Sequence, residues 1–158
     1  MLIKLTIAAF FLSVGQALAG NITLDADGGV EYHQKEQKLV AVGNARASKE
    51  DLSIRAETLV GFYDSQTKNR FSRLEAYEDV VMKTPRADAD GDSLVYDIAN
   101  DTAILKGYPA HIKTPDADIT AKGSITYYPT KKQAIARDNV IAADAEGNKV
   151  HADLMTAY

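Results

Sequence analysis

The stretch DLSIRAETLVGFYD, residues 51–64, alternates apolar and polar side chains through its first half. Leu52, Ile54 and Ala56 fall on one side of an extended chain, and Arg55 falls on the other. Alternation with a period of two is typical of a β-strand that buries one face. The stretch therefore predicts a strand whose apolar side faces the interior of the protein.

The same alternation returns in ADITAKGSITYY, residues 117–128, where Ile119, Ala121, Ile125 and Tyr127 share one side. No segment after residue 20 keeps a helical period long enough to predict a helix. Turn-forming clusters separate the alternating runs: DGG at 27–29, DSQTKN at 64–69, DIAND at 97–101, PTKK at 129–132 and AEGNK at 145–149. We therefore predict an all-β fold for the chain after residue 20.

Five of the eight tyrosines recur at intervals of 31, 33, 31 and 31 residues: Tyr32, Tyr63, Tyr96, Tyr127 and Tyr158. Six or seven residues before each tyrosine stands an alanine followed by a charge: Ala26, Ala56, Ala89, Ala121 and Ala152. An apolar residue usually stands two positions before the tyrosine, although Gly61 and Thr156 depart from this rule. These features indicate a repeat of about 31 residues.

Each repeat is expected to contain about four short antiparallel strands, because a turn and a further apolar strand follow midway through the unit. These midway segments are GNARA from Gly43, YEDVVM from Tyr77, GYPAHI from Gly107 and RDNVIA from Arg137. One unit of this size cannot bury its apolar face alone, whereas stacked units build a continuous interior. The stack would leave unpaired strand edges at both ends.

The first 19 residues predict a signal peptide, with Lys4 before an apolar run and small residues before a cleavage site after Ala19. The apolar run is too short to span a bilayer. Residues 20–158 are expected to form a single exported domain, which we place in the periplasm. The sequence has no cysteine, so no disulfide supports the fold, and its net charge of −4 argues against a nucleic-acid partner.

Two aspartate-rich stretches invite comparison with calcium loops, ADADGDSLVY at 87–96 and DADGGVEY at 25–32. Counting from Asp88, the first ligand positions fit an EF-hand loop, but Ser93 replaces the required glycine and Ala99 the required glutamate. We interpret both stretches as turns between repeats. A calcium-dependent surface protein is the less favoured alternative.

No catalytic constellation can be assembled from the sequence. His33, His111 and His151 are widely separated and share no metal-ligand spacing. No nucleophile elbow, glycine-rich phosphate loop or zinc-protease motif is present, and thiol chemistry requires a cysteine. We therefore expect a protein that is not an enzyme and that carries neither a cofactor nor a metal.

The apolar interior remains as the candidate binding site, because concave sheet interiors with few polar groups suit apolar ligands. Small inward residues such as Ala56, Ala110, Ala121 and Ala142 would leave room between its walls. The interior could equally be a filled core. By strand parity the inward positions include Ile54, Leu59, Tyr63, Val80, Met82, Leu94, Tyr96, Ile112, Ile119, Ile125, Tyr127 and Val140.

The leader and the motifs GNARA, LSIRAETLVGFYD, ADGDSLVYD, TAILKG and ITAKGSITYY together resemble the OstA-like domain of the LptA family. That family carries a G-N-V strand followed by I-x-A-D-x-L-x-Y, which Gly43–Ala45 and Ile54–Leu59 match in part. The resemblance covers essentially the whole chain after the leader. It implies a twisted, open β-jellyroll whose two sheets part to form an apolar slot.

The resemblance also implies a function and partners. Members of this family carry lipopolysaccharide across the periplasm with its lipid A acyl chains in the slot. They join end to end through edge strands, with an LptC-like component at the inner membrane and an LptD-like component at the outer membrane. The alternative is a structural β-solenoid scaffold that polymerises through the same edges and holds no lipid.

Overall fold

The computed structural model describes residues 22–66, 70–97, 99–100, 102–128, 131 and 133–158. The predicted signal peptide and its cleavage site after Ala19 lie outside these residues. The regular elements of the described chain are β-strands, which confirms the all-β prediction. They are β1 (Thr23–Asp25), β2 (Val30–His33), β3 (Lys38–Lys49), β4 (Leu52–Tyr63), β5 (Phe71–Lys83), β6 (Asp88–Asp97), β7 (Thr102–Lys106), β8 (Ala110–Lys113), β9 (Ala117–Ala121), β10 (Ser124–Tyr128), β11 (Gln133–Asp144) and β12 (Lys149–Ala157). None of the described ranges contains a helix long and apolar enough to cross a membrane.

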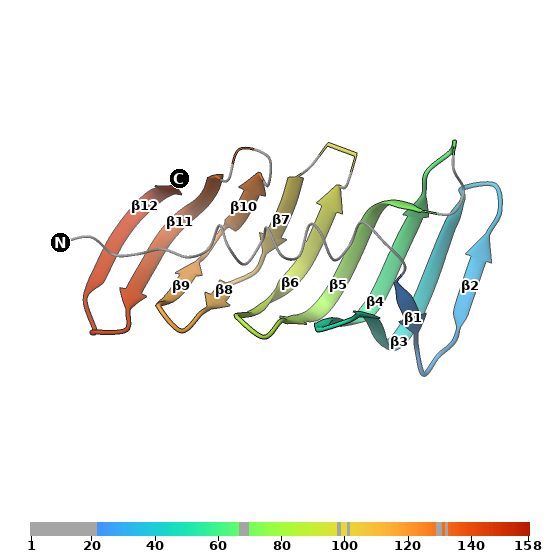
Figure 1. Cartoon of the computed structure of the whole chain (residues 1–158), viewed down its shortest axis with the longest axis horizontal. Coiled ribbons are helices and arrows are strands. Elements are labelled where there is room, and N and C mark those ends of the chain that lie inside the picture. The colour runs from blue at the N-terminus through green and yellow to red at the C-terminus, as the bar shows by residue number, and fades with distance from the viewer. Residues whose placement is uncertain (1–21, 67–69, 98, 101, 129–130, 132) are drawn as a thin grey trace.

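The strands form one 12-stranded antiparallel sheet that advances in chain order along the long axis of the molecule (Figure 1). β6 pairs with β7 along one half and with β8 along the other, and β11 pairs in the same way with β10 and β9. β7 with β8, and β9 with β10, therefore each occupy the place of one long strand. At the end of the sheet that holds the N-terminal strands, which we call the first end, β1 and β2 both pair with β3.

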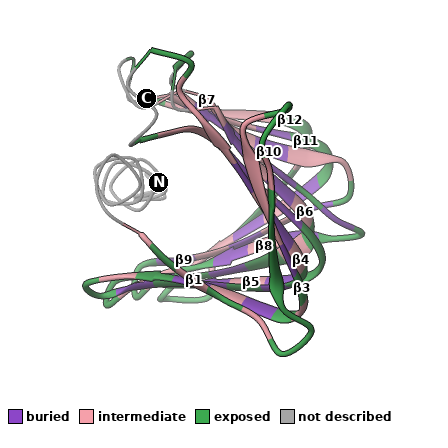
Figure 2. Cartoon of the chain, turned by 90° about the vertical axis from the view of Figure 1, so that its right-hand side faces the viewer, coloured by how far each residue is buried: buried purple, intermediate pink, exposed green. Residues whose placement is uncertain are grey.

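The sheet folds over on itself into two arms (Figure 2). One arm contains β7 and β10, together with β2, and the other contains β8 and β9, together with β1. We call them the β7–β10 arm and the β8–β9 arm, each name giving two strands and not a range. The long strands cross from one arm to the other, so each contributes to both. The resemblance implied two sheets, whereas the structure has a single bent sheet, because six of the twelve strands, β3 to β6, β11 and β12, continue through the bend.

Two-residue β-bulges produce the bend in β3, β5 and β11, where the pairing register shifts between Val42 and Ala45, Tyr77 and Val80, and Arg137 and Val140. Both residues of each bulge have positive φ angles: Gly43 (85°) and Asn44 (44°), Glu78 (66°) and Asp79 (51°), and Asp138 (70°) and Asn139 (51°). Bulges of this kind bend a strand and increase its twist. The predicted midway turns are thus wrong for three units, since only GYPAHI lies at a break between two strands.

The repeat predicted from the tyrosines corresponds to a pair of antiparallel bent strands. Tyr63, Tyr96 and Tyr127 stand at or near the ends of β4, β6 and β10, and Tyr158 directly follows β12. Tyr96 and Tyr127 in the middle of the stack are buried, whereas Tyr32 and Tyr158 at its ends are 59% and 91% exposed. The end positions are exposed because they lack a neighbouring unit on one side.

The interpretation of ADADGDSLVY as a turn is wrong, because Asp88–Asp97 forms strand β6. A Cβ at Gly91 would lie 2.5 Å from the carbonyl oxygen of Lys106, so this glycine permits a close approach between neighbouring strands. In the other stretch the interpretation holds, since β1 ends at Asp25 and β2 begins at Val30 after a turn. The two similar stretches therefore have different structures, a turn in one copy and a strand in the other.

The turn before β6 carries a sequence pattern that recurs before β9, K-T-P-x-A-D at 83–88 and 113–118. The N–H of Thr84 donates to the carbonyl of Ala87 at 2.9 Å, and the N–H of Ala87 donates to Thr84 Oγ1 at 3.1 Å. The matching bonds between Thr114 and Ala117 are 2.8 and 3.0 Å long. Both turns therefore close the free edge of the β8–β9 arm in the same way.

Candidate functional site

The inner face of the bent sheet holds the site residues expected from strand parity. Eleven of the twelve are buried, with at most 2% of their surface exposed, and Tyr63 is half-buried. Period-two alternation accounts for this placement, because successive side chains of a strand point to opposite faces. Their role in lipid binding remains a prediction.

Cross-strand pairing joins seven of these residues with further apolar residues into two continuous rows that run at right angles to the strands. The row in the β8–β9 arm consists of Leu24, Ala47, Ile54, Met82, Ala89, Ile112, Ile119, Ala142 and Val150. The facing row in the β7–β10 arm consists of Ala41, Leu59, Ala76, Leu94, Leu105, Ile125, Ala136 and Met155. With strands about 4.8 Å apart, the first row extends over roughly 38 Å.

Alanine side chains, which project only a short way from the sheet, make up much of the inner face. Half of the buried apolar residues in the described chain are alanine: Ala41, Ala45, Ala47, Ala56, Ala76, Ala87, Ala89, Ala103, Ala110, Ala117, Ala121, Ala134, Ala136 and Ala142. No polar or charged residue among those described is buried with them. Both rows therefore mix larger apolar side chains with alanines.

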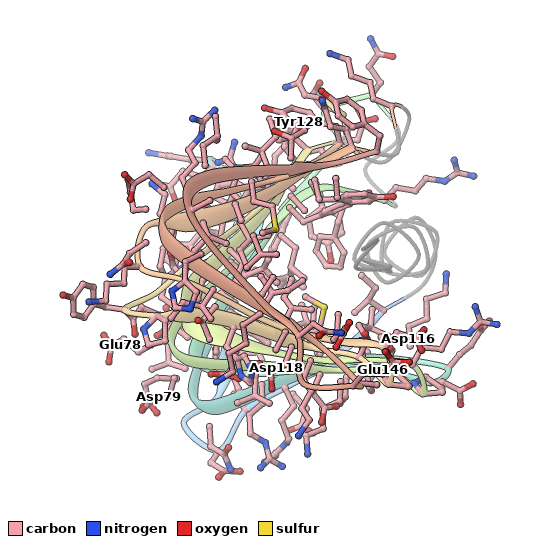
Figure 3. All side chains as sticks on the ribbon, turned by 90° about the vertical axis from the view of Figure 1, so that its left-hand side faces the viewer. Glu78, Asp79, Asp116, Asp118, Tyr128 and Glu146 are labelled. Atoms are coloured by element: carbon pink, nitrogen blue, oxygen red, sulfur yellow. The ribbon has the colours of Figure 1, made fainter. Side chains whose placement is uncertain are left out.

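Seen from the β12 end, polar side chains project from the outer side of the sheet, from the bend and from the edges of the arms (Figure 3). Glu78 and Asp79 lie at the bend, and Asp116 and Glu146 lie at the free edge of the β8–β9 arm. Tyr128 lies on the opposite arm. The described residues contain no group of His, Asp and Glu side chains arranged to hold a metal ion.

An aromatic cluster lies at the first end of the inner face, on the β7–β10 arm. The ring of Tyr63 stacks on Phe71 with centroids 4.7 Å apart, and Tyr32 meets Tyr63 edge-on at 6.3 Å. The Phe71 ring covers Gly61, where a Cβ would lie 2.8 Å from Phe71 Cδ1. Burial raises the pKa of Tyr63, and Tyr32 adds to this effect. Phe71 was not predicted as a site residue from the sequence. The signal was Gly61, which stands where the repeat usually has an apolar residue and leaves space for the Phe71 ring.

A histidine network lies on the outer face of the β8–β9 arm and joins three strands. His111 Nδ1 lies 2.9 Å from Asp90 Oδ1, and His111 Nε2 lies 2.8 Å from Asp118 Oδ1. Burial lowers the pKa of His111, but the hydrogen bonds to Asp118 and Asp90 outweigh it, so the net pKa is raised. Two carboxylates hold both ring nitrogens, which favours a structural role for this imidazole.

The two ends of the sheet differ. β12 pairs with β11 and with no other described strand, so one edge of its nine residues has no partner in the described chain. At the opposite end, the short strands β1 and β2 each cover only part of β3. Unpaired strand edges are templates for pairing with another chain.

Comparison with known proteins supports the fold described above. A family model described as "LptA/(LptD N-terminal domain) LPS transport protein" matches residues 23–133. Among solved structures, the chain is similar to LptH of Pseudomonas aeruginosa, the LptA homologous periplasmic component of a lipopolysaccharide transport device. The TM-score is 0.64 at 13% sequence identity, over 88% of this chain and 95% of the other, which establishes a shared fold. No curated protein sequence matches the chain.

Proposed function

This chain belongs to the LptA and LptD N-terminal domain family of lipopolysaccharide transport proteins, and we propose that it carries lipopolysaccharide through the periplasm from the inner to the outer membrane. The acyl chains of lipid A would lie against the inner face of the bent sheet. The sugar portion would remain outside, near the charged free edges of the arms.

The observation that carries this proposal is the continuity of the apolar rows across the strands. A row that begins at Leu24 and ends at Val150 contains no charged side chain at any level. Each buried CH₂ group gains about 0.8 kcal/mol, so a polar interruption along the path would trap or reject an acyl chain. An uninterrupted path lets the lipid move along the sheet without crossing such a barrier.

The ends of the sheet support a bridge assembled from several chains. The unpartnered edge of β12 and the partly covered edge of β3 can each accept a strand by β-augmentation, in which main-chain hydrogen bonds supply the affinity. Tyr32 and Tyr158 repeat the positions that are buried within the stack, and a neighbouring chain would bury them too. We propose self-association of this kind, with an LptC-like component at one end and an LptD-like component at the other.

Site-specific photo-crosslinking in cells tests the cargo. A photoreactive residue at Ile54 or Tyr96, both on the inner face, should label lipopolysaccharide. The control is Arg137, which is exposed and points to the opposite face of β11 from the buried Ala136. Labelling at the inner positions that does not exceed labelling at Arg137 would refute lipid carriage and favour a scaffold without cargo.

Export and cleavage can be tested independently of cargo. The mature protein isolated from the periplasmic fraction should begin at Gly20. Recovery of the chain in the cytoplasm with Met1 or Leu2 at its N-terminus would contradict the predicted leader. Mass spectrometry of the intact protein distinguishes the two results.

A further inference from the structure

A hollow of about 470 Å³ lies on the outer face of the β8–β9 arm, near its first end. β1, β3, β4 and β5 form it, and their outward side chains surround it. Its lining combines charged residues, two serines and the apolar residues Ala47, Ile54 and Val81. The residues relevant to binding are Asp25, Arg46, Ser48, Ser53, Arg55 and Lys83.

Cross-strand register brings these residues together from distant parts of the sequence. Arg46 pairs with Asp25 on one side and with Arg55 on the other. In the adjacent row, Ser53 pairs with Ser48 on one side and with Lys83 on the other. Both rows share the outer face, because residues two apart on a strand point the same way.

The charges around the hollow are not balanced. Arg46 is held by acidic partners, since its Nε donates to Asp25 Oδ2 at 3.2 Å and its Nη2 donates to Asp27 Oδ1 at 3.1 Å. Within the described chain, Arg55 and Lys83 form no ion pair. This concentration of cations occurs in a protein whose net charge is −4.

The direct pairing of Arg46 with Arg55 is also unfavourable in itself. Like charges opposite each other on antiparallel strands destabilise a sheet. Asp25 and Asp27 form ion pairs with Arg46, and Asp27 also attracts Arg55 over a longer distance. An anion bound at the hollow would remove this conflict, and departures from local sequence rules are typical of functional sites.

We propose that this hollow binds a phosphomonoester group. A phosphate dianion matches the two cations that form no ion pair, and its oxygens can accept hydrogen bonds from the guanidinium fork of Arg55, the ammonium of Lys83 and the hydroxyls of Ser48 and Ser53. The charged and hydroxyl side chains of the site lie on the face of the sheet opposite to the inner apolar rows. The site therefore goes beyond the proposed carriage of acyl chains and does not depend on it.

The test is a titration of the isotope-labelled protein, purified from the periplasm, by two-dimensional NMR. The probes are glucosamine 1-phosphate, inorganic phosphate and glucosamine. Saturable shifts at the backbone amides of Ser48, Ser53 and Arg55 are expected with the two phosphorylated probes and not with glucosamine. A tenfold preference for glucosamine 1-phosphate would identify a sugar phosphate as the ligand, and equal affinities would identify the phosphate group alone.

Variants make the test specific. Arg55→Gln and Lys83→Gln should each weaken phosphate binding by roughly tenfold or more, as expected for the loss of a charge-assisted hydrogen bond. Arg137→Gln removes the same charge from an exposed position on the other arm and should change the affinity less than about twofold. Absence of saturable shifts, or shifts that persist unchanged in both variants, would overturn the proposal. Inner-face crosslinking would be unaffected, so the two proposals fail separately.

Discussion

Replacement of Gly61 by alanine is expected to destabilise the protein only while Phe71 is present. A Cβ at residue 61 would lie 2.8 Å from Cδ1 and 3.0 Å from Cζ of the Phe71 ring, so the ring would have to move. Gly61 does not have a positive φ angle, so an alanine at this position would not strain the backbone. The clash with Phe71 is therefore the dominant unfavourable effect.

The expected magnitudes follow from two opposing contributions. Overpacking of a filled site typically costs about 1–3 kcal/mol. Alanine in place of an unstrained glycine stabilises by about 0.4–1 kcal/mol, because it restricts the unfolded chain. Gly61→Ala should thus lower the free energy of unfolding by up to about 2.6 kcal/mol in the natural protein. In a Phe71→Ala background it should raise that free energy by about 0.4–1 kcal/mol.

Urea unfolding of four proteins measures this effect: the natural chain, each single variant and the double variant. The coupling between Gly61 and Phe71 should be about 1–3 kcal/mol. Equal changes in both backgrounds, within about 0.5 kcal/mol, would refute the packing of Phe71 over Gly61. The Phe71→Ala variant also tests the aromatic cluster separately, since the ring of Tyr63 loses its stacking partner.

Three further predictions concern the outer face and the bend. The pKa of His111 is raised in the folded protein, so its stabilisation is complete below the unfolded-state pKa and disappears as the pH rises past the folded-state pKa. His111→Gln should therefore lower the free energy of unfolding by less than about 1 kcal/mol at about pH 5 and leave it unchanged at about pH 9. Equal losses of stability at the two pH values would contradict the proposed stabilisation by the His111 network. Glu78→Asn should stabilise by about 0.5 kcal/mol in the same assay, because asparagine enters the left-handed region more easily, and a lower urea midpoint would contradict this. Arg46→Met should speed hydrogen exchange at the amides of β1 and leave those of β9 unchanged, and equal protection of β1 in both proteins would show that Arg46 does not hold that strand.

Much of the inner face follows from the sequence, because alternation depends only on strand geometry. Ile54 and Ile119 lie on the inner face as expected from the residues on either side of them. The tyrosine spacing likewise indicates the stack, since each repeat adds one pair of strands. These features are local or periodic, and a single sequence is sufficient to predict them.

The bend, the aromatic cluster and the outer hollow depend on information that is not local. Glu78 and Asp79 take left-handed backbone angles that their residue types do not require. Phe71 covers Gly61 because the register shifts between Phe62 and Tyr63, a property of the paired strands. The outer hollow needs the joint register of four strands, so Lys83 cannot be placed beside Ser53 from sequence spacing alone.

The bulges in β3, β5 and β11 have a consequence for how such a molecule can change in length. Because one chain segment supplies both arms at each level, duplicating a repeat would lengthen both arms together and open no seam between them. Each added pair of strands would extend the molecule by about 10 Å. Reach can therefore evolve in fixed steps of one repeat while the cross-section stays the same.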